Sequence, residues 1–306
     1  MAYASGQTIS ATDYNSFVST FNGVWGTGSG DSGYGQSNTL STVAAGATVS
    51  ATEWSTLIAR LNSALTHQSG SGSGITSPVT GNTITAIATL STNVTNSSTN
   101  RRLFNSTRGT PSTTNYDATW SSTTPTSFQQ VRTVTFASAN QARYFFNAGG
   151  QIGIALSVPA GGSDNNKESD WSTLTGTNVG TFNFRIGDNG RTGTGGTLTA
   201  NTAIGFYNLT STNQQALQIA STTAAYTLNT ITINVKCDVA SNASGGATVL
   251  TFTIDYNDGA ADNNNVGAGT LDQINMTMRA AVTVTPPETT NLSNSWGTVT
   301  PAASVN

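Results

Sequence analysis

One segment near the start of the chain occurs twice. Residues 6–14 read GQTISATDY, residues 46–54 read GATVSATEW, and the register continues without a gap to residues 22 and 62. A self-match at a fixed spacing is typical of a duplicated supersecondary unit. The sequence therefore predicts the same local structure in both copies.

Each copy carries the signals of an amphipathic helix. Ser10 and Ser50 stand at N-cap positions, and Asp13 and Glu53 follow three residues later, as in a capping box. Hydrophobic residues then recur at i, i+3, i+4 and i+7, the period of one helical face. They are Tyr14, Phe17, Val18 and Phe21 in the first copy and Trp54, Leu57, Ile58 and Leu61 in the second. We predict helices over about 10–22 and 50–66, with Ile9 and Val49 as the outer halves of hydrophobic staples.

Each predicted helix has one apolar stripe that must be buried. The two stripes either pack on each other or pack on copies from neighbouring subunits. Two repeats are too few for a solenoid, but they suffice for a paired helical module. We expect the module to dock the subunit on a larger assembly or on sister copies, and the candidate assembly and docking residues that would supply the buried area are Tyr14, Phe17, Phe21, Trp54, Leu57 and Leu61.

Composition and period divide the rest of the chain. The two-helix docking module covers 1–68, and a linker rich in Gly, Ser, Thr and Asn covers 69–125, in which Ile84–Leu90 suits a helix or a strand. From 126 to 285, short β-branched runs alternate with Gly, Asn and Asp turns, which indicates an antiparallel β-sandwich or jelly roll. Residues 286–306 are expected to be an extended tail. The predicted fold class is α+β, mainly β.

The candidate strands of this domain are 131–136, 143–147, 151–158, 180–186, 202–207, 215–219, 230–238, 248–256 and 275–285.

The chain carries unusually little charge. Charged residues make up 8% of it, against roughly 25% in an ordinary soluble domain. Ser, Thr and Asn fill roughly 40%. A hydrophobic content of 36% with low net charge favours a folded protein over a disordered one. Such a surface resists association weakly, so it suits a protein that lives in an assembly.

The charge balance and the apolar runs also limit the partners. A formal net charge of −3 gives no electrostatic footprint for nucleic acid. No run approaches the apolar length of a membrane span, so we expect no membrane insertion. The start lacks a basic region and an apolar core, so we expect no signal peptide and synthesis in a cytoplasm.

Motifs that resemble ligand sites have simpler structural explanations. Residues 28–33 match G-x-G-x-x-G, but a dinucleotide site needs a strand before the loop and a helix after it, so we interpret them as a loop between the repeats. The Asp-rich segments 164–170 and 255–262 have the oxygen content of a calcium loop without the order of one. Hairpin and loop chemistry explains both, and we predict no metal and no cofactor.

The residue types needed for catalysis are scarce. His67 is the single histidine and is expected to cap or pack the second helix. Cys237, the single cysteine, lies in a predicted strand and excludes an intramolecular disulfide. No carboxylate pair stands out for a glycosidase. We predict that the chain is not an enzyme. Trp120 and Trp171 are candidates for stacking on a sugar, although core packing is the commoner role.

Several phrases of the sequence resemble small virion structural proteins of tailed bacteriophages, especially those that infect cyanobacteria. They are the start 1–6, the segment 9–14, the loop 30–36, the second helix ending at His67–Gln68, and the run 142–150 (ARYFFNAGG), and together the likeness covers about half of the chain. The resemblance implies a particle component without catalytic residues, located in or near the tail.

The expected function is therefore a non-enzymatic structural subunit of a phage particle, associated with the tail, neck or fibre. Its expected partners are other virion proteins and further copies of itself in a homo-oligomer, and its expected location is the virion. One alternative is a receptor- or glycan-binding adhesin whose partner is a host-surface glycan or receptor. A second alternative is a capsid decoration protein.

Overall fold

The computed structural model describes residues 10–79, 87–122, 126–260 and 272–304. The chain forms two compact units, and each is built from three stretches of sequence. Unit 1 contains 1–109, 140–150 and 286–297, and unit 2 contains 110–139, 151–285 and 298–306. The chain therefore enters each unit more than once, which a division into consecutive domains does not anticipate.

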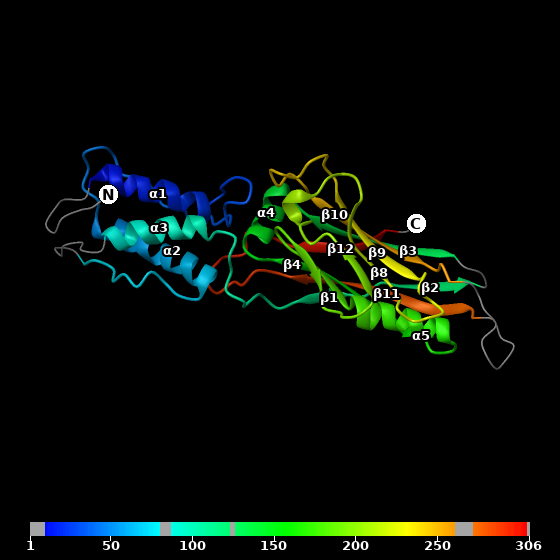
Figure 1. Cartoon of the computed structure of the whole chain (residues 1–306). Helices are drawn as coiled ribbons and strands as arrows, with labels where there is room; N and C mark the ends of the chain where they lie inside the picture. The colour runs from blue at the N-terminus through cyan, green and yellow to red at the C-terminus, as the bar shows by residue number, and fades with distance from the viewer. Residues whose placement is uncertain (1–9, 80–86, 123–125, 261–271, 305–306) are drawn as a thin grey trace. The chain divides into compact units, whose positions relative to one another are not determined.

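Three helices form the body of unit 1 (Figure 1): α1 (Ala11–Trp25), α2 (Ala51–Ser69) and α3 (Ile87–Thr99). The first two confirm the helices predicted from the repeat. Ser10 Oγ accepts from the Asp13 backbone N–H at 3.1 Å, and Ser50 and Glu53 form a complete capping box. The staple residue Ile9 lies outside the described residues. The third helix falls in the predicted linker, where 87–90 are helical and 84–86 are not described.

The apolar stripes of α1 and α2 form the core of unit 1. Tyr14 and Phe17 set their rings edge-on to Trp54, with centroids 5.3 and 6.2 Å apart. All six candidate docking residues are buried: Tyr14, Phe17, Phe21, Trp54, Leu57 and Leu61. The two stripes therefore pack on each other within unit 1, and the expectation that these six residues make the docking contact is wrong. These side chains are enclosed within the unit, and none forms an exposed docking surface, because a third helix, α3, covers what two helices alone would leave open.

The helix α4 (Ala139–Asn147) stands where the sequence predicted a strand at 143–147. The prediction is wrong because aromatic residues favour strands in general, whereas here every side chain from 142 to 147 is buried and the burial decides the structure. The N–H groups of Gly149 and Gly150 bond to the carbonyls of Phe146 and Phe145, and Gly149 has φ of 87°, so the helix ends in a glycine cap.

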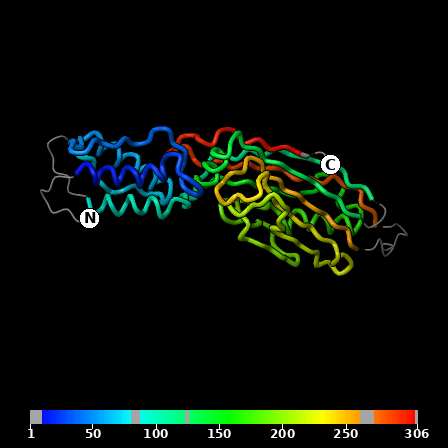
Figure 2. Tube along the Cα trace, turned by 90° about the horizontal axis from the view of Figure 1, so that it is seen from above, coloured from blue at the N-terminus to red at the C-terminus, as the bar shows by residue number. Residues whose placement is uncertain are grey.

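The described strands of unit 2 form two six-stranded antiparallel sheets. The first sheet contains β1 (Ser112–Thr114), β2 (Asp117–Ser122), β4 (Gln151–Ala160), β5 (Thr181–Phe184), β6 (Asn189–Arg191) and β11 (Ile274–Thr285). The second contains β3 (Ser127–Phe136), β7 (Thr197–Ala200), β8 (Gln214–Ala220), β9 (Thr230–Cys237), β10 (Val249–Asn257) and β12 (Val299–Ser304). In Figure 2 the red strand β12 runs beside the green strand β3, in the register that joins Val299 to Phe136.

Several elements of unit 2 differ from the predicted ones, and the short strands β1, β2, β6 and β7 were not predicted. The predicted strand 202–207 is absent, and the short 3₁₀ turn Phe206–Asn208 occupies its end. The predicted extended tail contributes 286–297 to unit 1 and β12 to the second sheet. Between β4 and β5 the chain forms α5 (Asn166–Ser172) and a π-helical segment (Thr173–Val179).

Side chains from the two sheets meet in one core. Phe182 and Phe184 of β5 approach Phe252 of β10 edge-on, with centroids 6.4 and 5.6 Å apart. Gln130 and Arg132 of β3 donate to the carbonyls of Met278 and Ala280 in β11. Two antiparallel sheets with a shared core form a β-sandwich. The predicted fold class, α+β and mainly β, is confirmed.

Within the described part of the chain, no helix combines the length and the apolar character needed to cross a membrane.

Candidate functional site

A glycine-rich loop at 26–36 folds back over the C-terminal end of α1. The N–H groups of Tyr34, Gln36 and Gly35 bond to the carbonyls of Val24, Trp25 and Gly26 at 2.8–2.9 Å. These carbonyls stand at the helix end, where no intrahelical donor remains for them. Gly28, Gly30, Gly33 and Gly35 have positive φ, a conformation that glycine adopts without strain. The loop is therefore a built cap for α1.

Helix α4 holds this loop from its other side. The Arg143 guanidinium donates through Nε to Gly30 O at 2.9 Å and through Nη2 to Thr27 O and Ser32 O at 3.2 and 2.9 Å. Asn147 Nδ2 donates to Gly33 O at 3.0 Å. A Cβ added to Gly35 would lie 2.3 Å from the Tyr144 ring, so glycine is required for this approach. We call 26–36 with Arg143, Tyr144 and Asn147 the glycine-loop clamp.

The clamp explains the two phrases that the sequence singled out separately. The loop 30–36 and the run 142–150 contact each other within unit 1. A phosphate site at 28–33 would require backbone N–H groups directed at the ligand. Here the carbonyls of Gly30 and Ser32 accept from Arg143, the residues that follow cap α1 through the N–H groups of 34–36, and the next helix begins only at Ala51. The interpretation as a loop between the repeats is confirmed.

A buried polar cluster adjoins the loop inside unit 1. Gln68 Nε2 donates to Tyr34 Oη and to Ser97 O, both at 2.8 Å. Tyr34 Oη donates to Arg101 O at 3.0 Å. His67 Nδ1 lies 2.9 Å from Glu288 Oε1. The cluster thereby connects the loop, the ends of α2 and α3, and the segment 286–297.

Segment 286–297 is held by further side-chain bonds. Gln36 Nε2 donates to Ser293 O at 2.9 Å, and the Ser293 N–H donates to Gln36 Oε1 at 2.8 Å. Ser295 Oγ donates to Tyr34 O at 2.5 Å. The loop that caps α1 therefore also fixes a segment more than 250 residues later in the sequence.

His67 does not have the surroundings of a catalytic base. Only 1% of its surface is exposed, and Nε2 is buried without a hydrogen-bond partner. Burial holds the pKa of His67 below its ordinary value, although the bond to Glu288 acts in the opposite direction. The nearest hydroxyl, that of Tyr34, has a pKa raised by burial. His67 packs and links the end of α2, as the sequence suggested, with Glu288 as the partner that the sequence did not indicate.

The lowered pKa of His67 predicts that unit 1 loses stability in mild acid. Below the ordinary histidine pKa of about 6.5, the unfolded chain binds a proton that folded His67 resists. The stabilising contribution is therefore complete above that pH and is lost as the pH falls below it. When amide hydrogen exchange is used to monitor the unfolding of unit 1 in urea, the midpoint urea concentration should be lower at pH 5 than at pH 7.5.

His67→Gln is the control for this pH effect, because glutamine can still bond to Glu288 and does not titrate. The variant should lose less stability than the wild type between the two pH values. An equal loss in both proteins would assign the effect to other groups. The pKa of Glu288 is also lowered, by bonds from the Asn291 N–H and His67 that outweigh its burial, so its own contribution is lost at still lower pH.

The two Asp-rich segments of unit 2 meet each other. Lys167, from the first segment, places Nζ 3.1 Å from Oδ2 of Asp258, from the second. An ammonium of the chain itself therefore stands where a calcium ion was considered. Among the described residues, no group of three or more His, Cys, Asp or Glu side chains is arranged to hold a metal ion. Residues 261 and 262 of the second segment lie outside the described range.

The candidate sugar-stacking tryptophans are core residues of unit 2. Trp120 and Trp171 are 4% and 0% exposed, with ring centroids 4.9 Å apart. Trp120 also stacks on Phe128 at 5.5 Å. A sugar ring cannot reach either indole in the folded unit. The expectation of a stacking platform at these two residues is therefore corrected, and the commoner core role holds.

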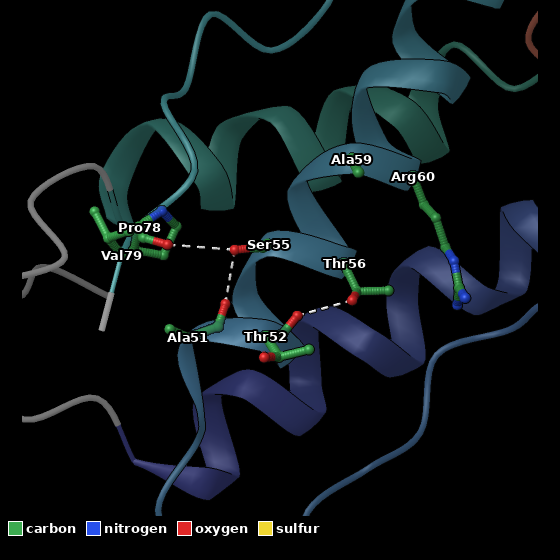
Figure 3. Close-up of a pocket in the computed structure, with 8 residues that line it drawn as sticks. All are labelled: Ala51, Thr52, Ser55, Thr56, Ala59, Arg60, Pro78 and Val79. Carbon is green, nitrogen blue, oxygen red and sulfur yellow. Dashed lines mark hydrogen bonds between the residues drawn. The ribbon is translucent and has the colours of Figure 1, made fainter. Parts of the chain in front are cut away.

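An open groove of about 470 Å³ runs along the outer face of α2 (Figure 3). Its lining residues are Ala51, Thr52, Ser55, Thr56, Ala59, Arg60, Pro78 and Val79. Ser55 Oγ donates to Ala51 O at 2.7 Å, and Thr56 Oγ1 donates to Thr52 O at 2.8 Å, so both hydroxyls bond back to their own helix (Figure 3). Arg60 is the one ionisable side chain of this lining, and the groove has no acid–base pair.

Comparison with models of known protein families, with characterised proteins and with solved structures finds no match to this chain.

Proposed function

We propose that this protein is a non-enzymatic structural subunit of a bacteriophage particle, associated with its tail, neck or fibre. Unit 1 is the assembly module, and its contact surface is the outer face of the three helices. The support comes from the resemblance of its sequence phrases and from the chemistry of that outer face. Partners are other virion proteins and further copies of the chain.

Glu53 and Arg60 of α2 are partly exposed, and the observation that carries the proposal is the absence of charge at the exposed positions of α1, α2 and α3. Their exposed side chains are all Ser, Thr, Ala or Asn: Thr12, Ser16, Ser19, Thr20, Thr52, Ala59, Ser69, Ala88, Thr89, Thr92, Thr95, Asn96 and Thr99. Ser and Thr are poorer helix formers than the Lys, Glu and Arg that usually cover exposed helices. The same loss of helix propensity occurs on all three helices. This favours a surface that another protein covers.

Hydrogen bonds within the helices strengthen this argument. Thr56, Thr92 and Thr95 each donate a hydroxyl proton to the carbonyl four residues earlier, at 2.8–3.0 Å. A hydroxyl bonded to its own backbone binds water less than a free one and can be covered at lower cost. Small side chains also allow close approach of a second backbone. The outer face is therefore suited to a contact with another protein, whereas the aromatic core is enclosed within unit 1 and is not available for one.

Substitution of lysine on the outer face tests the proposal. Thr92→Lys in α3 and Thr52→Lys in α2 should each reduce incorporation into purified particles by roughly tenfold, since an unpaired charge in an interface costs more than 1.4 kcal/mol. Thr199→Lys on the exposed strand β7 is the matched control and should incorporate normally. Quantitative mass spectrometry of particles measures all three.

Two results would count against the proposal. If purified particles contained none of this protein, the premise that it is a particle subunit would be wrong. Full incorporation of Thr52→Lys and Thr92→Lys would show that the helical faces are not the contact surface. The adhesin alternative now needs a binding surface other than Trp120 and Trp171, because both are buried.

A further inference from the structure

A lysine and an aspartate face each other in the interior of unit 2. Lys167 lies in α5, Asp258 follows β10, and Nζ is 3.1 Å from Oδ2. Their side chains are 0% and 1% exposed. The Lys167 ammonium also donates to Ala260 O at 3.1 Å, which directs Nζ toward this end of β10.

The surrounding groups link the pair to a second carboxylate. Asn229 Oδ1 accepts from the Ala260 N–H at 3.2 Å, and Asn229 Nδ2 donates to Asp170 Oδ2 at 3.3 Å. Asp170 lies one helical turn after Lys167 in α5 and also accepts from Ser221 Oγ at 2.5 Å. Asn229 thus links the buried carboxylate of Asp170 to the backbone of Ala260, whose carbonyl accepts from Lys167.

Aromatic side chains enclose the same region. Trp171 directly follows Asp170, Tyr256 precedes Asp258 by two residues, and both are 0% exposed. Their ring centroids are 6.2 Å apart. An ammonium and a carboxylate removed from water lose hydration that their mutual attraction repays only in part.

We propose that Lys167 and Asp258 join in an intramolecular isopeptide bond. One proton moves from Nζ to the Asp258 carboxyl group, Nζ attacks Cγ, and a tetrahedral intermediate forms. The nitrogen then loses a second proton, which passes to the departing hydroxyl. The C–O bond breaks and one water molecule leaves, so the amide forms without oxidant, reductant or any co-reactant.

A covalent bond between Lys167 and Asp258 would cross-link the folded chain, which no intramolecular disulfide can do here. With Cys237 as the single cysteine, an intramolecular disulfide is excluded. The amide would connect α5 to the end of β10 and close a loop of 91 residues. Closing a long loop restricts the unfolded chain and thereby stabilises the folded one. This inference is independent of the proposed function, because it concerns the interior of unit 2.

Intact mass of the purified full-length chain tests the proposal directly. The folded wild type should be lighter than its sequence by one water molecule, and a tryptic digest should contain one peptide pair joined through Lys167 and Asp258. Lys167→Met and Asp258→Ala should keep the full mass of their sequences.

Asp258→Asn provides a sharper control. Its side-chain amide can react with Lys167 by releasing ammonia, and the product then has the same mass as the cross-linked wild type. A folded wild type that retains its full mass after prolonged incubation at neutral pH, with no joined peptides, would overturn the proposal. The pair would then be a buried ion pair. This result does not depend on whether any variant folds.

Discussion

Replacing Arg143 with methionine is expected to lower the free energy of unfolding of unit 1 by about 3–4 kcal/mol. Methionine keeps much of the length of the side chain and removes all of its donors. The carbonyls of Thr27, Gly30 and Ser32 then lose the buried guanidinium that bonds them in a partly buried setting. Hydrogen bonds from charged donors contribute more than neutral ones, and buried carbonyls left without donors carry a desolvation cost.

The loss should be visible first in the loop and then in the helix that it caps. Hydrogen exchange measured peptide by peptide should show faster exchange in 26–36 and at the C-terminal end of α1, with unit 2 unchanged. Arg102→Met is the matched control. Arg102 is 51% exposed and pairs with Asp31, a type of surface contact worth under about 1 kcal/mol. If Arg143→Met lowered the free energy of unfolding by no more than Arg102→Met does, the clamp would contribute little to stability.

The sequence was sufficient to predict α1 and α2 because their signals are local. Ser50, Glu53 and the spacing of Trp54, Leu57 and Leu61 all lie within a dozen residues. Each of these features favours the same helix, so tertiary contacts only confirm it. The alternation of β-branched residues and turns in unit 2 predicted most of the sandwich for the same reason.

Helix α4 could not be predicted in this way. Its run of Arg143, Tyr144, Phe145 and Phe146 favours a strand by composition, and only burial on all sides selects the helix. The one local signal in favour of a helix was the pair Gly149–Gly150, which ends it. In the sequence alone, the same pair suits a turn between two strands equally well, because such turns also require glycine.

The contacts of the glycine-loop clamp lie beyond the reach of local patterns. Arg143 bonds to Gly30 across 113 residues, and His67 pairs with Glu288 across 221. The sequence singled out both halves of the clamp, but no feature of either half names the other. A single chain without aligned relatives offers no covariation to connect them. The contact between Lys167 and Asp258 could not be predicted either, because the sequence indicated only the oxygen-rich segments that contain them.

Replacing Trp54 with alanine is expected to lower the stability of unit 1 by about 4 kcal/mol, within the range for deleting a buried tryptophan side chain. The indole fills the space between Tyr14 and Phe17, and its removal leaves a cavity that two helices cannot close without moving. Hydrogen exchange in α1, α2 and α3 should accelerate together, because the three helices share this core. Thr52→Ala, on the exposed face of the same helix, should change stability by less than about 0.5 kcal/mol.

This comparison separates two roles for the repeated aromatic residues. If Trp54 is a core residue, the alanine variant loses helix protection and also fails to assemble, because the module no longer folds. If Trp54 were a contact residue, the variant would keep wild-type exchange protection and lose assembly alone. The burial of Trp54 at 1% exposure favours the first outcome. The duplicated sequence would then build the folded core of the module, and the Ser and Thr side chains between the repeated aromatic positions would remain the proposed contact surface.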